Sequence, residues 1–162
     1  MRAVSARVLA LTFLLLSATE GRSADFQKGL DAARRGDFEA ALREWTPLAE
    51  QGLDEAQFNL GTMYHLGNGV FQDYEQAFKW YGLAAEQEHA NAQTNLGVLY
   101  CYGQGADQSN VYAYMWASMS AENGGENGAQ LRDLIAGRMT PSQLEKAQDL
   151  GRECVAKDYK NC

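Results

Sequence analysis

The sequence predicts an all-α protein, a right-handed α-solenoid built from stacked antiparallel helix pairs. Three observations predict this fold class: an internal repeat of 36 residues, apolar residues at helical spacing within each repeat, and no stretch that alternates with a period of two. A helix pair of this kind buries its apolar stripe only against a neighbouring pair. The repeat therefore implies a row of pairs with capping ends, not an isolated hairpin.

The repeat is visible when residues 37–72 are aligned with residues 73–108, which needs no gap. Fifteen of the 36 aligned positions are identical, where chance gives about two or three. A third copy begins at the same shift, with Ala113 in the place of Ala77, and loses its register near Gly124. We therefore interpret the chain as a duplicated helical hairpin with degenerate ends.

Helices are expected at about 25–34, 37–51, 54–66, 73–88, 90–102, 109–123, 127–137 and 141–157. Asp73 and Ser109 each offer a side-chain oxygen to cap the first turn of the helix that follows. Gly67 and Gly103 end the helices before them, because glycine accepts the left-handed conformation that closes a helix.

Three further sites refine these elements. Thr140, followed by a proline and by a glutamine at the third helical position, predicts the start of the last helix. Pro47 lies inside the second helix and is expected to remove one backbone bond and bend it. Gly61 and Gly97 are expected to let paired helices approach closely, so a large side chain there costs about 1–3 kcal/mol. Trp and Tyr residues at helical spacing are interpreted as core.

The N-terminus has the pattern of a secretory signal peptide, assigned to residues 1–23. Basic residues precede an apolar run over 8–16, which is about half of the ~20 residues that a membrane-spanning helix needs. Cleavage after Gly21 or after Ser23 suits the small-residue preference. The sequence thus predicts an exported protein without a stable membrane span; an uncleaved amphipathic helix is the alternative.

Length and charge bound the function of the rest of the chain, residues 24–162. The 162 residues carry 14 Lys and Arg against 21 Asp and Glu, a net charge of −7, which disfavours nucleic-acid binding. From Glu44 to Leu131 the only basic residue is Lys79, against eleven acidic ones. A neutral or basic peptide or protein partner is therefore favoured.

The repeated pattern resembles the Sel1-like (Sel-one-like) repeat, a relative of the tetratricopeptide repeat. The residues that carry the resemblance are Ala56, Leu60, Gly61, Tyr64, Gly67, Gly69, Asp73, Ala77, Trp80, Tyr81 and Ala84, most of them with copies 36 residues later. Counted in that phase, the repeats span about 54–89 and 90–125, after a degenerate half-repeat (25–51) and before capping helices (127–157). The resemblance implies a non-enzymatic protein-interaction module, and it favours the periplasm, with secretion beyond it as the other destination.

In tetratricopeptide-like solenoids the first helix of each pair lines the concave face, and the resemblance carries this over to a peptide-binding groove. The expected groove residues are Phe58, Asn59, Thr62, His65, Asn95, Val98 and Tyr102, with Leu66, Thr94 and Cys101 at the same face. Asn59 and Asn95 are one repeat apart, and an amide can bond both the C=O and the N–H of an extended peptide. The alternative is that both asparagines hold neighbouring helices or loops together.

No pattern of residues indicates a metal site, a cofactor or a catalytic centre. The two histidines, His65 and His89, have no partner at metal-ligand spacing. Cysteine-rich secreted relatives are described as penicillin-binding or β-lactamase-like, which makes a hydrolase the alternative function. Here no serine is followed three residues later by lysine, and the paired cysteines of those relatives are missing.

The three cysteines predict one disulfide in an oxidising compartment. Cys154 and Cys162 form the favoured pair, which would tie the tail to the last helix. Cys101 would then remain a small apolar residue. A bridge from Cys101 to either tail cysteine is the alternative.

Overall fold

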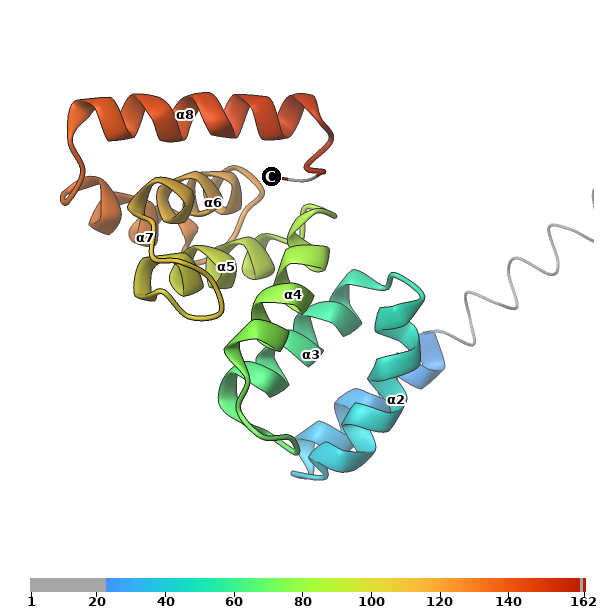
Figure 1. Cartoon of the computed structure of the whole chain (residues 1–162). Helices are drawn as coiled ribbons and strands as arrows, with labels where there is room; N and C mark the ends of the chain where they lie inside the picture. Colours follow the sequence, from blue (N-terminus) through green and yellow to red (C-terminus); the bar gives the residue numbers. More distant parts are fainter. Residues whose placement is uncertain (1–22, 161) are drawn as a thin grey trace, which may run out of the picture.

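The computed structural model describes residues 23–160 and 162, which form α-helices joined by turns, with no strand among them. After a helical segment over 23–34 come α2 (Phe38–Glu50), α3 (Asp54–Leu66), α4 (Tyr74–Ala85), α5 (Ala90–Tyr102), α6 (Asn110–Glu122), α7 (Gly128–Ala136) and α8 (Pro141–Ala156). From α2 to α7 each helix packs against its neighbours in the sequence, whereas α8 packs on α6, and the chain progresses from one end of the molecule to the other (Figure 1). The predicted all-α solenoid of stacked helix pairs is confirmed.

Helix boundaries follow the capping residues that the sequence offers. The Asp73 side chain accepts a hydrogen bond from the Gln76 N–H at 3.0 Å, and Ser109 accepts one from the Tyr112 N–H at 3.3 Å. Gly67 ends α3 in the left-handed conformation, with φ 71°. The expected helix starts and stops therefore agree with the structure to within three residues, and Pro47 lies inside α2 as expected.

Two glycines permit the close approach of paired helices. A Cβ atom at Gly61 would lie 2.6 Å from the ring of Tyr81, which is completely buried. A Cβ at Gly97 would lie 3.1 Å from the carbonyl oxygen of Ala113 in α6. The contact at Gly61 is against a side chain, whereas the contact at Gly97 is against helix backbone.

Successive hairpins are also joined by buried glutamines at equivalent positions of the repeat. Gln57 Nε2 donates to the Ala49 carbonyl at 3.0 Å, and Gln93 Nε2 donates to the Ala85 carbonyl at 3.2 Å. Each glutamine thus adds a second hydrogen bond to a carbonyl in the last turn of the preceding helix, which also accepts a backbone N–H from Gly52 or Glu88. The contacts between successive hairpins therefore include hydrogen bonds as well as apolar packing.

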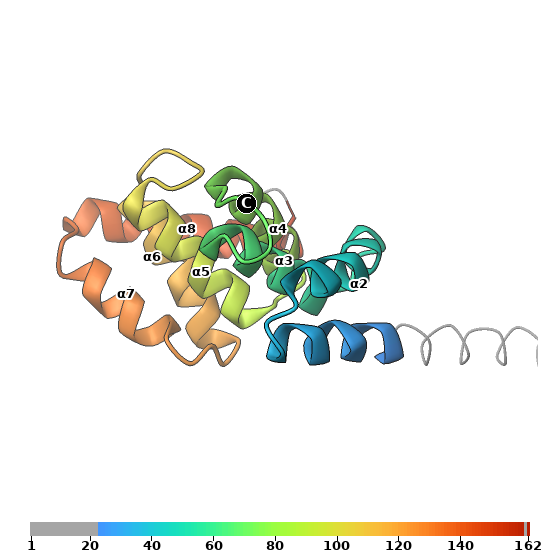
Figure 2. The same cartoon turned by 90° about the horizontal axis from the view of Figure 1, so that it is seen from below.

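The C-terminal segment folds back on the stack after α8, which runs across α6 (Figures 1 and 2). Thr140 and Gln143 form the expected capping box at the start of α8. Cys154 and Cys162, the pair that the sequence favoured, are joined in a disulfide with their Cα atoms 5.4 Å apart. Beside it, Lys160 Nζ lies 3.8 Å from Glu86 Oε2, so the tail reaches the end of α4.

The expected signal peptide lies outside the described residues, apart from Ser23. Within the described part of the chain, no helix is both long and apolar enough to cross a membrane.

Candidate peptide-binding face

The expected groove residues lie on α3 and α5, the first helices of the two repeats. We call the set Phe58, Asn59, Thr62, His65, Asn95, Val98 and Tyr102 the α3–α5 face. All of these side chains are half-buried except Tyr102, which is exposed. The two helices begin and end at equivalent residues of the repeat, because Gly67 and Gly103 both cap them in the left-handed conformation. Equivalent positions of α3 and α5 are therefore comparable one by one.

The hydroxyl group of Tyr81 lies close to three residues of this face, Thr62, His65 and Asn95. The Tyr81 hydroxyl donates to Thr62 Oγ1 at 3.2 Å and lies 3.5 Å from His65 Nδ1. Burial raises the pKa of Tyr81, and hydrogen bonds with Thr62 and Asn95 partly offset that rise. Tyr81 comes from α4, so the second helix of the first repeat supplies the group that joins α3 to α5.

Aromatic rings pack beside this hydroxyl. Phe58 stacks on the imidazole of His89 with ring centroids 4.6 Å apart, and it lies 5.9 Å from the Tyr81 ring. The Nδ1 atom of His89 accepts a hydrogen bond from the Ala92 N–H at 3.2 Å, so His89 is the N-cap of α5. Burial lowers the pKa of both His89 and His65.

The two asparagines of the repeat have different surroundings. The Asn95 side chain interacts with the Tyr81 hydroxyl and lowers its pKa, which agrees with the alternative that these amides hold neighbouring helices together. Asn59 is half-buried, and its amide makes no hydrogen bond to another described residue. The difference has a cause in the sequence: the residue 36 positions before Tyr81 is Trp45, whose indole donates to the Phe26 carbonyl instead. Asn59 thus has no phenol to bond.

Two residues expected at this face are not available to a ligand. Thr94 is buried and its hydroxyl lies 2.6 Å from Ser120 Oγ, while Cys101 is buried with Ala113 and Ile135. The expectation for these two was wrong, because Ser120 of α6 covers Thr94, and α7 packs against α5 and brings Ile135 over Cys101. The usable part of the face therefore lies on α3 and on the remaining positions of α5.

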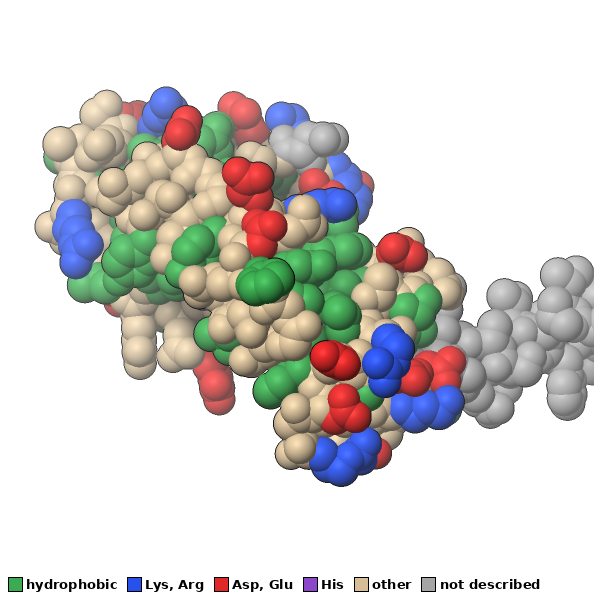
Figure 3. Space-filling model, turned by 60° about the horizontal axis from the view of Figure 1, so that its bottom comes forward, with side chains coloured by type: hydrophobic (Ala, Val, Ile, Leu, Met, Phe, Trp, Pro, Cys, Tyr) green, Lys and Arg blue, Asp and Glu red, His purple; other side chains and the backbone are tan. Residues whose placement is uncertain are grey.

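Large apolar side chains are exposed at the ends of α3 and α5. Leu66 is 59% exposed and Tyr102, one repeat later, is 68% exposed. Phe71, in the turn between α3 and α4, is 97% exposed. Figure 3 shows hydrophobic side chains at the surface in the middle of one face, with charged side chains gathered over the N-terminal helices. Exposed apolar groups on a charged, acidic chain are typical of a contact surface.

Sequence reasoning missed the roles of Tyr81, His89 and Phe71. Tyr81 was interpreted only as core, because its position on the helix stripe does not reveal where its hydroxyl points. His89 could have been found, since it precedes the predicted α5 in the place that Asp73 and Ser109 occupy before α4 and α6. No signal in the sequence marked the exposure of Phe71.

Carboxylates lie at the start of α3, next to His89. The charge of Asp54 partly offsets the lowering of the His89 pKa, and a hydrogen bond with Asp54 raises the pKa of Glu55. This end of the face is therefore negative. Among the described residues, no three His, Cys, Asp or Glu side chains are grouped so that they could hold a metal ion.

The row of stacked helix pairs places this protein in the α-solenoid class. A model of the Sel1 repeat matches residues 54–89 and 90–125. Together with the structural relatives below, this match shows that the chain belongs to the Sel1 repeat family. Proteins of this family generally mediate protein–protein interactions as non-enzymatic scaffolds.

Two solved structures are similar to the whole fold. One is a protective antigen present in uropathogenic Escherichia coli strains that displays an SLR fold; the identity is 29% and the TM-score 0.79, over 94% of this chain and 35% of that one. The other is a Sel1 repeat protein from Oxalobacter formigenes, with 33% identity and a TM-score of 0.64, over 76% of this chain and 97% of that one. This chain thus spans about a third of the length of the antigen. Among curated proteins the sequence has no significant match.

Proposed function

We propose that this protein is an exported, non-enzymatic interaction module of the cell envelope that binds an extended peptide segment along the α3–α5 face. The face would form the concave groove of the solenoid, and the partner would be a neutral or basic protein or peptide. Export rests on the signal-peptide pattern of residues 1–23, and the mature N-terminus is expected after Gly21 or Ser23.

The observation that carries the proposal is the unpaired amide of Asn59. This half-buried amide has no hydrogen-bond partner among the described residues, so its donors and its acceptor are free to bond a ligand. One amide can donate to a C=O and accept from an N–H of the same extended backbone. Exposed Leu66 and Tyr102, one repeat apart, would add apolar contacts along the same segment.

Charge supports a neutral or basic partner. Asp54 and Glu55 lie in the first turn of α3, and Lys79 is the only basic residue from Glu44 to Leu131. Opposite charge on a partner speeds its association, and salt screens that attraction. Binding is therefore expected to weaken as the ionic strength rises.

Site-specific photo-crosslinking in the envelope fraction tests the face. A photoreactive residue at Leu66 or Tyr102 is expected to capture the partner, whereas one at Leu83, which is 37% exposed on α4, is not. Asn59→Ala should reduce capture from Leu66 at least fivefold. Asn127→Ala is the matched control, because Asn127 is exposed at the start of α7, makes no capping bond with its side chain and lies outside α3 and α5. Equal capture from position 83, or capture unchanged by Asn59→Ala, would remove this assignment.

The hydrolase alternative is tested on the same protein with a fluorescent penicillin. The proposal expects no specific labelling. Stable labelling that disappears when one serine is replaced would show a nucleophilic site and overturn the non-enzymatic assignment.

A further inference from the structure

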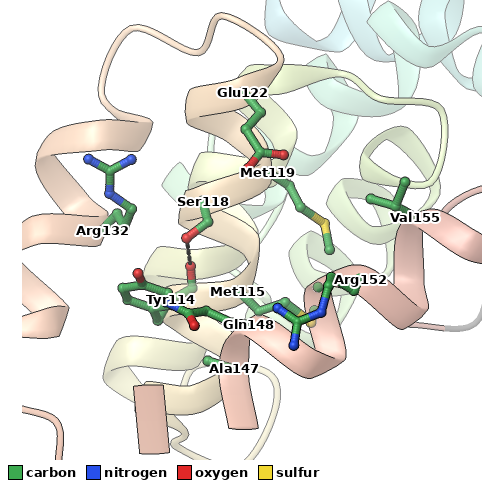
Figure 4. A pocket seen from close by; sticks show the side chains of 11 residues that line it. Tyr114, Met115, Ser118, Met119, Glu122, Arg132, Ala147, Gln148, Arg152 and Val155 are labelled. Carbon is green, nitrogen blue, oxygen red and sulfur yellow. Dashed lines mark hydrogen bonds between the residues drawn. The ribbon is translucent and has the colours of Figure 1, made fainter. Parts of the chain in front are cut away.

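A cavity of about 530 Å³ lies between α6, α7 and α8, outside the α3–α5 face. Its size falls in the range of about 300–1,000 Å³ that is typical of small-molecule sites. It is lined by apolar side chains from α6 and α8 and by charged side chains from all three helices (Figure 4).

The floor of the cavity is apolar and open. It is formed by the buried Met115 and Met119 and by Gly151, whose missing side chain leaves space above the two thioethers. A Cβ at Gly151 would lie 3.8 Å from Met115 Cγ and 3.9 Å from Met119 Cε, which is ordinary contact. Val155 is 45% exposed beside this floor. Methionine side chains adapt to irregular apolar groups, so the floor suits an alkyl or aromatic group.

Two arginines line opposite sides of the cavity, Arg132 from α7 and Arg152 from α8 (Figure 4). Each has an acidic neighbour on its own helix: Arg132 Nη2 lies 2.8 Å from Asp133 Oδ1, and Arg152 pairs with Asp149. Both pairs are at the surface, where such pairs contribute about 0–1 kcal/mol. Each guanidinium has five N–H donors, so donors remain for an anion in the cavity.

Glu122 is the one carboxylate that lines this cavity. Its charge opposes a second negative charge in the cavity and so favours a monoanion over a phosphate monoester. The Ser118 hydroxyl is already used within α6, where it donates to the Tyr114 carbonyl at 2.8 Å. The positive charge of this cavity therefore comes from the two arginines, beside the polar side chains of Tyr114 and Gln148.

We propose that this cavity binds a small amphipathic monocarboxylate. Its apolar group would lie on Met115, Met119 and Gly151, and its carboxylate would bond Arg132 or Arg152. The site is separate from the α3–α5 face and does not depend on the function proposed for that face.

Methyl NMR of the methionines tests the proposal on the intact mature protein. N-acetyl-phenylalanine is titrated as the probe, and its primary amide serves as the uncharged counterpart. The methyl signals of Met115 and Met119 are expected to shift and saturate, with binding of the amide at least tenfold weaker. Met63, buried in α3 in a different part of the core, is expected not to move. Absence of saturable shifts at Met115 and Met119, or equal affinity for the amide, would overturn the proposal.

Two variants locate the binding. Gly151→Leu fills the floor and is expected to abolish the shifts; Gly82→Leu in α4 is the matched control, because a Cβ there meets no atom within 4 Å. Should Gly151→Leu fail to fold, Gly151→Ala is expected to weaken binding severalfold in a folded protein. Unchanged affinity in a folded Gly151 variant would contradict the proposal.

A second pair of variants tests the anion. Replacing Arg132 and Arg152 together by glutamine is expected to weaken binding of the carboxylate at least tenfold and to leave the amide unaffected. Arg138→Gln, in the turn before α8 and outside the cavity lining, is the control and should have no effect. An unchanged carboxylate affinity in the double variant would also overturn the proposal.

Discussion

Tyr81 contributes both to the packing of paired helices and to the α3–α5 face. The whole side chain is buried: its ring packs against Gly61, and its hydroxyl donates to Thr62 of α3 and interacts with Asn95 of α5. The equivalent residues in the neighbouring units are Trp45 and Ala117, which have no hydroxyl. The polar centre of the α3–α5 face therefore occurs at one junction only, although the backbone repeats.

At Gly61 the close approach to Tyr81 predicts a large effect of a small substitution. Gly61→Ala is expected to lower the free energy of unfolding by about 1–3 kcal/mol, because its Cβ would overlap the buried ring at 2.6 Å. Urea unfolding measures this value. The matched control is Gly82→Ala in α4, which meets no neighbouring atom and should be neutral or stabilising by up to about 1 kcal/mol. Similar stability of the two variants would show that the helices can separate without loss.

At His89 burial predicts a pH dependence of stability. The folded-state pKa lies below the usual 6.5, so the unfolded chain takes up a proton first as the pH falls. Stability should therefore be complete above about pH 6.5 and decrease as the pH falls below that value. His65 adds to the same trend, because burial lowers its pKa as well.

The contribution of His89 can be isolated with His89→Asn. Asparagine keeps a side-chain acceptor for the Ala92 N–H and does not titrate, so the loss of melting temperature over this pH range should become smaller. Thermal unfolding at pH 7.0 and 5.5 measures the difference. If the variant retains the full pH dependence, His89 is not the titrating group.

Among the elements, helix ends were predictable because each end is decided locally. Asp73, Ser109 and Thr140 cap the helices that they precede, and the glycine after α3 or α5 ends it. The contacts of a helix with other helices, in contrast, are not decided locally. The sequence did not indicate that α7 covers Cys101 of α5, since that contact depends on the path of the chain after Gly124.

The capping box of α8 gives a prediction for a whole element. Thr140→Ala removes the acceptor for the Gln143 N–H and is expected to destabilise the protein by about 1 kcal/mol. Ser142→Ala is the control, because Ser142 lies two residues after Thr140 in the first turn of α8, is exposed and does not cap the helix. Denaturant unfolding of both variants should separate them. Equal stability would mean that α8 does not require its cap.

For the whole molecule, a row of stacked hairpins depends on contacts between neighbours, and its ends need covering. The C-terminal tail folds back on the stack. Its disulfide loop brings Lys160 to the end of α4, and Tyr159 and Cys162 pack on the main core. Contacts between residues this far apart in the sequence join the C-terminal cap to the first repeat.

The disulfide gives a prediction at this scale. Cys162→Ser is expected to lower the free energy of unfolding by about 2–3 kcal/mol, as estimated for a loop of this short length. The pairing itself is checked by tryptic digestion without reduction, which should yield residues 153–157 linked to residues 161–162. Cys101, buried in the fold, should react with iodoacetamide only after unfolding. A crosslinked peptide that contains Cys101 would contradict this arrangement.

The helical class, the 36-residue unit and most helix ends follow from the sequence alone, because periodicity and capping act within a few residues. The repeat also predicts that equivalent positions of α3 and α5 share an orientation. Which side chains at those positions remain accessible depends on tertiary packing: Tyr81 interacts with Asn95 and not with Asn59, and α7 buries Cys101. Tertiary packing alone also forms the cavity between α6, α7 and α8. Such features depend on how distant segments pack, and local sequence patterns carry no information about that packing.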